Sequence, residues 1–221
     1  MPKMKQQLIE RIKVLDRMDG WCTQTKALDL AQLIIDHRPD VVVELGVYGA
    51  RSLAAMAMAC QHIYNGHCTG IDPWTKDAAL EGGTNPENDK WWAELDIERI
   101  YRVAISNIRT FGLDDFITIE RKHDVDALPL FGDGSIGLLN IDSNHGELVS
   151  VRTVKDWVPK VKIGGLVAFD DSDWPSTQKA VALLHEGLGT KHVKTYNMTG
   201  PPDDAGNPTH AGQWMLFERV A

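Results

Sequence analysis

The sequence predicts an α/β fold built on a mainly parallel β-sheet. Short runs of β-branched and other apolar residues alternate along the chain with longer segments whose apolar residues recur at helical spacing. The short runs are continuous rather than alternating, which is typical of strands covered on both faces. A chain of 221 residues is long enough for one sizeable core. We therefore expect one domain over residues 1–221, with N-terminal helices in 1–38 and the sheet in 39–221.

The predicted elements follow one another in a regular order. The N-terminal helices span residues 5–18 and 25–37; Thr23 or Thr25 can cap the second helix, and Pro39 follows its end. The first strand is Val41–Leu45, and a glycine turn and an alanine- and methionine-rich helix come next. The remaining expectations are strands at 68–72, 116–120, 136–142 and 165–171, helices at 91–111, 147–158 and 175–188, and a closing pair of strands near 192–196 and 213–219.

Two predicted loops, residues 73–90 and 198–212, are long for a compact domain. Both are rich in Gly, Pro, Asn and Asp, and loops of this length are usually functional or disordered. The first one leaves a strand at the carboxyl edge of the sheet, where open parallel sheets bind their ligands. We expect it to cover a site, to be mobile without substrate and to become ordered with it.

The composition of the chain limits which kinds of molecule it is expected to bind. The formal net charge of −8 argues against nucleic acid, because phosphate binding needs a basic surface. Three cysteines without metal-knuckle spacing indicate free thiols in a reducing compartment. The first residues contain no signal-peptide apolar region, and no apolar run has the length of a membrane span. We expect a cytoplasmic protein with no membrane partner; homo-oligomerisation stays open.

The stretch "ELGVYGARS", Glu44–Ser52, combines a strand end, a glycine turn and a helix start. Such a turn lets a ligand approach the backbone, and the first helical N–H groups are free to bind it. A dinucleotide site would need G-x-G-x-x-G, but Tyr48 stands at the second glycine, which disfavours pyrophosphate. The alternative is a turn that needs glycine only for packing.

Acids and a histidine follow the next strands. In "GIDPW", Asp72 ends a strand and could accept both hydroxyls of a ribose; the alternative is a turn or helix-cap aspartate before Pro73. In "RKHDVDALP", His123 or Asp124 could contact an adenine ring, although a solvated loop acid is an equal alternative.

Three more carboxylates end two strands that would be neighbours in this topology: Asp142, Asp170 and Asp171. Carboxylates at one edge repel each other unless they are protonated or bridged by a cation. Oxygen ligands suit a hard ion such as Mg²⁺, so we expect these three acids to hold Mg²⁺. The alternative is helix capping by Ser172 or Asp173 before Pro175.

His145 follows Asp142 by three positions and is the candidate general base. A hydroxyl is a poor nucleophile at neutral pH; a bound metal ion lowers its pKa, and a nearby imidazole can take its proton. The alternative is a structural histidine at a helix start. Several tryptophans near the same edge could face a sugar ring or a sulfonium cation, or belong to the core: Trp74, Trp91, Trp92 and Trp174.

These motifs together resemble the S-adenosylmethionine site of class I methyltransferases. The stretch from Asp142 to Asp171 is similar to one branch, the metal-dependent O-methyltransferases that act on sugars of macrolides and polysaccharides. That family carries D-x-x-H, a helix, "GG", a strand and "DD", matched here by Asp142, His145, Gly164–Gly165 and Asp170–Asp171. The resemblance covers roughly residues 44–184, and the chain departs from the pattern at Asn144 and Gly146.

The resemblance implies a Rossmann-like methyltransferase fold, a mainly parallel seven-stranded sheet with helices on both faces and an antiparallel last strand. It also implies a cofactor site for S-adenosylmethionine and catalytic roles for His145 and Asp142. The implied cofactor-binding residues are Glu44, Gly46, Tyr48, Ser52, Asp72, Trp74 and Asp124.

The sequence thus predicts a Mg²⁺-dependent O-methyltransferase acting on a hydroxyl of a sugar or glycoside. A catechol-type O-methyltransferase would use the same metal chemistry. A nicotinamide-dependent dehydrogenase is disfavoured by Tyr48, and a non-catalytic nucleotide-binding protein would not need Asp142, His145 and the acid pair together.

Overall fold

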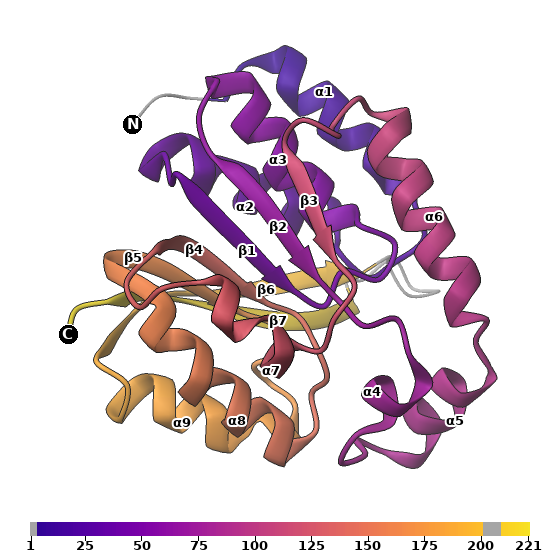
Figure 1. Cartoon of the computed structure of the whole chain (residues 1–221), viewed down its shortest axis with the longest axis vertical. Coiled ribbons are helices and arrows are strands. Elements are labelled where there is room, and N and C mark those ends of the chain that lie inside the picture. Colours follow the sequence, from indigo (N-terminus) through magenta and orange to yellow (C-terminus); the bar gives the residue numbers. More distant parts are fainter. Residues whose placement is uncertain (1–3, 201–208) are drawn as a thin grey trace.

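A seven-stranded sheet forms the centre of the structure, a computed structural model that describes residues 4–200 and 209–221 (Figure 1). The strands lie in the order β3-β2-β1-β4-β5-β7-β6. All neighbouring pairs are parallel except those of β7, which runs antiparallel to β5 and β6. The predicted sheet with an antiparallel last strand is confirmed. The bounds are β1 Val41–Leu45, β2 His67–Ile71, β3 Ile117–Glu120, β4 Ile136–Ile141, β5 Val161–Phe169, β6 Thr190–Gly200 and β7 Thr209–Arg219.

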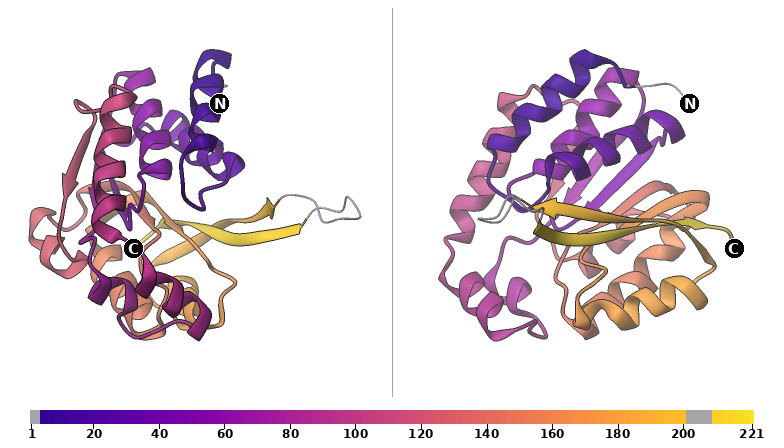
Figure 2. Two further views of the ribbon diagram at one scale, coloured as in Figure 1. Left: turned by 90° about the vertical axis from the view of Figure 1, so that its right-hand side faces the viewer. Right: turned by 180° about the vertical axis from the view of Figure 1, so that it is seen from behind.

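Helices cover both faces of this sheet (Figures 1 and 2). One layer holds α1 (Gln6–Val14), α2 (Gln24–His37), α3 (Arg51–Ile63) and α6 (Ile97–Thr110); the other holds α7 (Asp124–Ala127), α8 (Glu147–Trp157) and α9 (Gln178–Glu186). Single 3₁₀ turns adjoin α1, α7, α8 and α9: η1 Leu15–Arg17, η2 Leu128–Leu130, η3 Val158–Lys160 and η4 Pro175–Thr177. Because the sheet lies between the layers, the core consists of two hydrophobic clusters.

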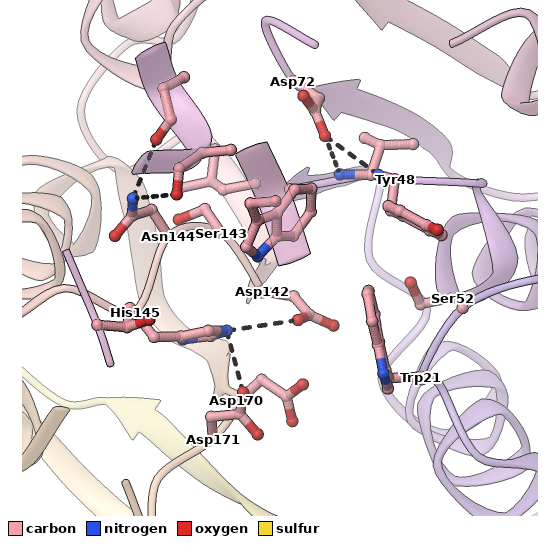
Figure 3. A pocket seen from close by; sticks show the side chains of 18 of the residues that line it. Trp21, Tyr48, Ser52, Asp72, Asp142, Ser143, Asn144, His145, Asp170 and Asp171 are labelled. Carbon is pink, nitrogen blue, oxygen red and sulfur yellow. Dashed lines mark hydrogen bonds and ion pairs between the residues drawn. The ribbon is translucent and has the colours of Figure 1, made fainter. Parts of the chain in front are cut away.

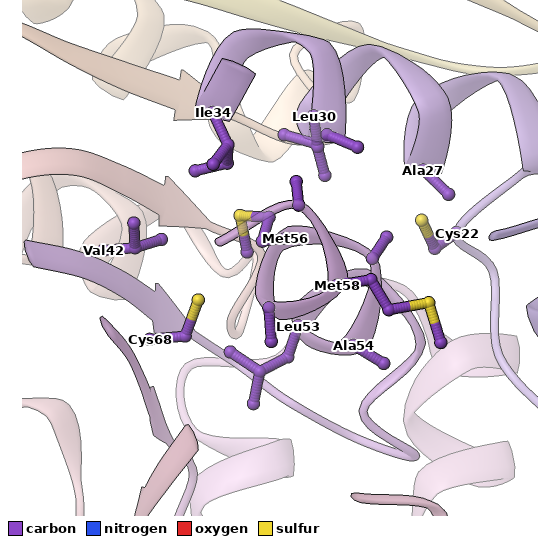
Figure 4. Close-up of a cluster of buried hydrophobic side chains, with 14 of the residues drawn as sticks. Cys22, Ala27, Leu30, Ile34, Val42, Leu53, Ala54, Met56, Met58 and Cys68 are labelled. Carbon is purple, nitrogen blue, oxygen red and sulfur yellow. The ribbon is translucent and has the colours of Figure 1, made fainter. Parts of the chain in front are cut away.

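Helix α3 is buried between α2 and the sheet (Figure 4). Every residue from Ser52 to Cys60 is buried, and most of them are Ala or Met. A helix that is apolar all round is an internal helix, and small side chains let its neighbours approach closely. The glycine turn that precedes α3 is therefore attached to a fixed element.

The start of α2 is set by a side-chain cap. Thr23 Oγ1 accepts a hydrogen bond of 3.2 Å from the backbone N–H of Lys26, which confirms the predicted cap. The buried residues of α2 recur at helical spacing and begin with Lys26, which is 1% exposed. A lysine thus occupies the first position of a stripe that is otherwise apolar.

The region between β2 and α6 differs from the sequence prediction. It contains two short helices, α4 (Lys76–Leu80) and α5 (Pro86–Glu94), where we expected a loop over residues 73–90. The single helix predicted over residues 91–111 is wrong, because the chain is extended at Leu95. Asp96 then caps α6 by accepting a 2.9 Å hydrogen bond from the Arg99 N–H. A capping aspartate starts a new helix where the apolar spacing alone suggested continuity.

Strands β6 and β7 extend into residues 198–212, the second predicted loop, and residues 201–208 lie outside the described residues. The pair carries Met198, His210 and Gly212 to the carboxyl edge of the sheet, where they line a cavity. Within residues 4–200 and 209–221, no helix is long and apolar enough to cross a membrane.

Candidate active site

A cavity of about 660 Å³ opens at the carboxyl ends of β1, β2, β4 and β5. This volume lies within the range of small-molecule sites, and the strand order reverses between β1 and β4, where open α/β sheets bind ligands. The turns after all four strands line it, together with the segment before α2, parts of α4 and α5, and the β6–β7 pair. Figure 3 shows how side chains from these segments face the cavity.

The glycine turn after β1 is shaped by the turn after β4. Gly46 has a φ of +82°, and a Cβ atom there would lie 2.0 Å from the backbone oxygen of Asp142. Only glycine fits this close approach. Tyr48 and Ala50 also have positive φ, at 47° and 69°, so the whole turn is tightly wound. The turn and the first acidic residue of the site are therefore in direct backbone contact.

Asp72 connects the turn after β1 to the turn after β2 through hydrogen bonds. Its Oδ2 accepts hydrogen bonds from the N–H groups of Val47 (3.0 Å) and Tyr48 (3.1 Å), and its Oδ1 accepts one from Trp74 (2.7 Å). The turn-aspartate alternative is thus observed. Asp72 also lines the cavity, and burial, partly offset by these hydrogen bonds, raises its pKa. A carboxylate has about four lone-pair sites, so one remains for a ligand hydroxyl.

Glu44, predicted as a cofactor ligand, does not line the cavity. Its side chain is completely buried, and its Oε1 accepts a 2.7 Å hydrogen bond from Nδ2 of Asn140. Its Oε2 has no hydrogen-bonding partner among the described residues. Burial is the main cause that raises the pKa of Glu44 to about 8. Glu44 is thus a buried, proton-holding residue of β1.

The other predicted cofactor residues do line the cavity: Gly46, Tyr48, Ser52, Trp74 and Asp124. Trp74 donates its indole N–H to the backbone oxygen of Tyr48 at 3.1 Å, which closes the wall between the first two turns. Asp124, at the start of α7, accepts a 2.9 Å hydrogen bond from Thr153 of α8. His123 lies beside it on the cavity wall.

The three acids Asp142, Asp170 and Asp171 meet at one edge of the cavity, as the topology predicted (Figure 3). A cation already bridges two of them. The Nζ atom of Lys26 lies 2.8 Å from Asp142 Oδ2 and 2.6 Å from Asp170 Oδ2. The helix-cap alternative is not observed, because neither η4 nor α9 has a side-chain cap. Sequence reasoning missed Lys26, although its place in an apolar stripe was a signal.

One ammonium does not balance three carboxylates. Burial, and then Asp142, raise the pKa of Asp170 and of Asp171 to about 7 each. Burial alone would lower the pKa of Lys26. The negative charges of Asp142 and Asp170 outweigh burial and hold this pKa well above its ordinary value. Lys26 is therefore charged, and the site keeps two negative charges in excess when all three acids are ionised.

The carboxylate oxygens of the three acids are potential ligands of a divalent cation. Among the described residues, no three His, Cys, Asp or Glu side chains are already arranged around one point. However, Asp170 Oδ1 is buried and has no hydrogen-bonding partner within the described chain. An unpartnered carboxylate oxygen beside excess negative charge fits a hard, oxygen-binding cation. Any such cation would share the site with Lys26, which already contacts two of the three acids.

His145 lines the cavity beside the three acids (Figure 3). Its Nε2 is 3.2 Å from Asp171 Oδ2 and 4.0 Å from Asp142 Oδ1, and its ring centroid is 5.5 Å from that of Trp174. Burial, against the pull of Asp142 and Asp170, lowers the pKa of His145. The imidazole is therefore neutral at pH 7 and able to accept a proton. The residue does not cap α8, whose cap is Gly146.

Asn144 joins this acidic loop to the region between β2 and α6. Its Nδ2 lies 2.9 Å, 3.1 Å and 3.0 Å from the backbone oxygens of Ala78, Ala79 and Glu81, at the end of α4. Arg152 of α8 adds an ion pair of 2.7 Å with Glu81. Asn144 stands between Asp142 and His145 in sequence, so α4 is attached directly to the loop that carries both.

Four aromatic side chains form a second wall of the cavity: Trp21, Tyr48, Trp91 and Trp92. Their ring centroids are separated by 4.9 Å to 6.5 Å. Trp21, from the segment before α2, is 62% exposed. The aromatic wall places the indoles of Trp91 and Trp92 on the cavity. Trp74 also lines the cavity, but it is almost completely buried and packs on Tyr101.

The sequence of residues 43–172, more than half of the chain, matches the family described as a methyltransferase domain. The chain belongs to this methyltransferase family. The predicted methyltransferase identity is thereby confirmed. The matched residues include the glycine turn, Asp72 and the three acids, whereas Lys26, Trp21 and the β6–β7 pair lie outside them.

Solved structures similar to the methyltransferase show its fold. Rv0187 from MTB, in a cofactor-bound form, is 13% identical, with a TM-score of 0.66 over 97% of this chain and 90% of that one. The O-methyltransferase TomG from Streptomyces achromogenes, involved in tomaymycin synthesis and in complex with SAM, is 13% identical (TM-score 0.65, 99% and 92%). The O-methyltransferase from Bacillus cereus in complex with SAH is also 13% identical (TM-score 0.62, 97% and 92%). No curated protein matches the sequence.

Proposed function

We propose that this methyltransferase transfers the methyl group of S-adenosylmethionine to a hydroxyl group of a sugar or glycoside. The observation that carries the proposal is that His145, Asp142 and Asp171 meet in the same cavity as the glycine turn after β1. A hydroxyl group that accepts a methyl group must lose its proton, and a base beside carboxylates can take that proton. The similar structures of TomG and of the Bacillus cereus enzyme, described with SAM and SAH, support the choice of methyl donor.

The turns after β1 and β2 would bind the methyl donor. The remaining lone pair of Asp72 can accept a ribose hydroxyl, and Ser52, Trp74 and Asp124 line the same part of the cavity. Tyr48 occupies the position where a dinucleotide site needs glycine, and its ring packs at 5.1 Å from Trp21. This favours a single nucleoside over the pyrophosphate of NAD, which argues against the dehydrogenase alternative.

His145 would remove the proton from the acceptor hydroxyl, while its Nε2 faces the acids. The imidazolium that results is stabilised by Asp171 and Asp142, at 3.2 Å and 4.0 Å. The acceptor oxygen then uses the freed electron pair to form a bond to the methyl carbon, while the electrons of the carbon–sulfur bond go to sulfur. The thioether product is neutral, so no acid is needed and positioning supplies much of the rate.

The proposal includes a divalent cation at Asp142, Asp170 and Asp171. When bound, such an ion orients an acceptor hydroxyl and lowers its pKa. The support is the excess of carboxylate charge over Lys26 and the unpartnered Oδ1 of Asp170. Mg²⁺ is the natural candidate for all-oxygen ligation.

A catechol-type acceptor is the second candidate. The aromatic wall favours it, because Trp21, Trp91 and Trp92 could stack on a planar ring as readily as on the apolar face of a sugar. Both acceptors present a hydroxyl to His145.

The test is calorimetry followed by an acceptor screen. We expect S-adenosylmethionine and its demethylated product to bind the full chain, and NAD not to bind. Transfer of a labelled methyl group to a panel of glycosides and catechols, with Mg²⁺ present, then identifies the acceptor class. Binding of NAD in place of S-adenosylmethionine would overturn the proposed reaction, and transfer confined to catechols would replace the sugar assignment.

A further inference from the structure

We propose that Lys26 is a positioning residue that acts as a built-in counter-charge for Asp142 and Asp170 and thereby weakens the binding of a divalent cation to these carboxylates. The inference rests on the proposed cation site. It predicts a methyltransferase whose metal ion exchanges readily with solvent instead of remaining bound.

Lys26 is fixed in this role by its helix. It lies in the first turn of α2, which the Thr23 cap holds in place. Its side chain is 1% exposed, and its Nζ contacts carboxylates from the ends of both β4 and β5. A buried lysine at such a position loses its hydration, so its two carboxylate partners must replace it. The ammonium group therefore stays at the acids whether or not another cation is present.

The two oxygens of each carboxylate, in Asp142 and in Asp170, have different surroundings. Lys26 takes Oδ2 of Asp142 and Oδ2 of Asp170. The other oxygen of Asp142 lies 4.0 Å from Nε2 of His145, and the other oxygen of Asp170 has no partner among the described residues. One donor oxygen on each acid thus stays available. Lys26 would therefore leave the remaining carboxylate oxygens free to bind a metal ion. It would weaken that binding by electrostatic repulsion between its ammonium group and the ion.

A purely structural ion pair would behave differently. If Lys26 only held α2 against the sheet, its removal would lower stability and would leave the affinity for metal ions unchanged or reduced, because the ligands would be less well ordered. A counter-charge predicts the opposite sign for affinity. By Coulomb's law, removing one positive charge a few ångströms from a divalent ion should strengthen binding by at least about tenfold.

The experiment measures Mn²⁺ binding by electron paramagnetic resonance in the full chain after treatment with a chelator, without S-adenosylmethionine. Lys26→Gln keeps a hydrogen-bond donor and loses the charge; Lys26→Met loses both. We expect both variants to bind Mn²⁺ at least about tenfold more tightly than wild type. Lys179→Met is the matched control, because it removes an exposed lysine whose ion pair with Glu147 (2.7 Å) does not line the cavity. Its affinity for Mn²⁺ should equal that of wild type.

Tighter binding in the variants, including the case in which only the variants bind, supports the inference. Equal, weaker or undetectable Mn²⁺ binding in folded variants overturns it. If both variants fold but are too unstable for the binding measurement, a larger rise of Tm on adding Mn²⁺ than in wild type supports the inference, and no such rise overturns it. Methyl transfer by wild type is measured separately, so that the proposed reaction can fail or stand on its own.

Discussion

The Nε2 atom of His145 lies 3.2 Å from Oδ2 of Asp171, in a position where burial lowers the pKa of the imidazole. Burial keeps His145 neutral near pH 7, and Asp171 gives the imidazolium a carboxylate partner once it forms. A base that is neutral before the reaction and stabilised after it suits proton removal from a hydroxyl.

His145→Ala should therefore reduce kcat by roughly 10²–10⁴-fold, the usual contribution of a positioned base. The affinity for S-adenosylmethionine should change little, because no predicted cofactor contact involves the imidazole. His37→Ala, at the exposed end of α2, is the control. A kcat within about threefold of wild type in the folded variant would return His145 to a structural role.

The pH dependence of the same pair gives an independent check. The pKa of His145 is lowered from its ordinary value of 6.5. At saturating Mg²⁺, which keeps the three acids ionised, wild-type kcat should therefore fall only as the pH drops below that value. In His145→Ala this acidic fall should disappear. A variant that keeps the same acidic limb would show that another group, such as Asp171, is responsible for it.

Activity should be lost in excess chelator and restored by Mg²⁺. The reason is that Lys26 balances only one of the three carboxylates beside the cavity when all three are ionised. Asp171→Asn should lose the Mg²⁺-dependent turnover and still bind S-adenosylmethionine in calorimetry. Asp133→Asn, an exposed acid paired with Lys160 at 2.7 Å, should behave as wild type. Full turnover in chelator would remove the cation from the proposed reaction.

Asp72→Ala should weaken the binding of S-adenosylmethionine by about 1.5–3 kcal/mol, the scale of hydrogen bonds to a charged group. The substitution removes a ribose acceptor and also frees the N–H groups of Val47, Tyr48 and Trp74. Calorimetry measures the loss. An unchanged Kd would exclude Asp72 from the cofactor site.

Asn144→Ala should release α4 from the acidic loop. Three backbone oxygens at the end of α4 lose their partner, so the amides of Lys76–Leu80 should exchange hydrogen faster. Substrate should slow this exchange in wild type, since we expect residues 73–90 to order on binding. Asn65→Ala, which removes an amide bonded to Arg38 and Pro39 far from the cavity, is the control. Equal exchange in all states would contradict a closing segment.

Glu44→Gln should stabilise the protein at alkaline pH. Burial raises the pKa of Glu44 from 4.5 to about 8 in the folded state, so the folded protein holds a proton that the unfolded chain releases. Its contribution to stability is complete below about pH 4.5 and is lost as the pH rises through 8. Relative to wild type, the variant should gain on the order of 4 kcal/mol between pH 5 and 8.5. Thermal melts at both pH values, with Glu10→Gln as control, measure it; a constant difference would contradict it.

The sheet and the position of the site could be predicted from the sequence because both follow from local patterns. Continuous apolar runs mark buried strands, and parallel strands bring their carboxyl ends to one edge. Asp142, Asp170 and Asp171 therefore had to meet once the topology was known. Glu44, expected as a cofactor ligand, lies one residue before the end of its strand, and its side chain is completely buried and outside the cavity lining.

The features that could not be predicted depend on contacts between distant segments. Lys26 is more than a hundred residues from its partners, and a lysine on a helix is ordinarily solvated. The end of α4 is bound through its backbone oxygens, which every residue possesses, so no side-chain pattern indicates the contact with Asn144. The break before α6 depended on recognising Asp96 as a cap.

The distribution of tryptophan gives the methyltransferase an intrinsic optical signal. Five of the seven tryptophans line the cavity: Trp21, Trp74, Trp91, Trp92 and Trp174. The other two, Trp157 and Trp214, are buried in the core. Emission that responds to ligands therefore originates mainly at the cavity, and unlabelled acceptors can be screened by fluorescence quenching before any methylated product has been identified.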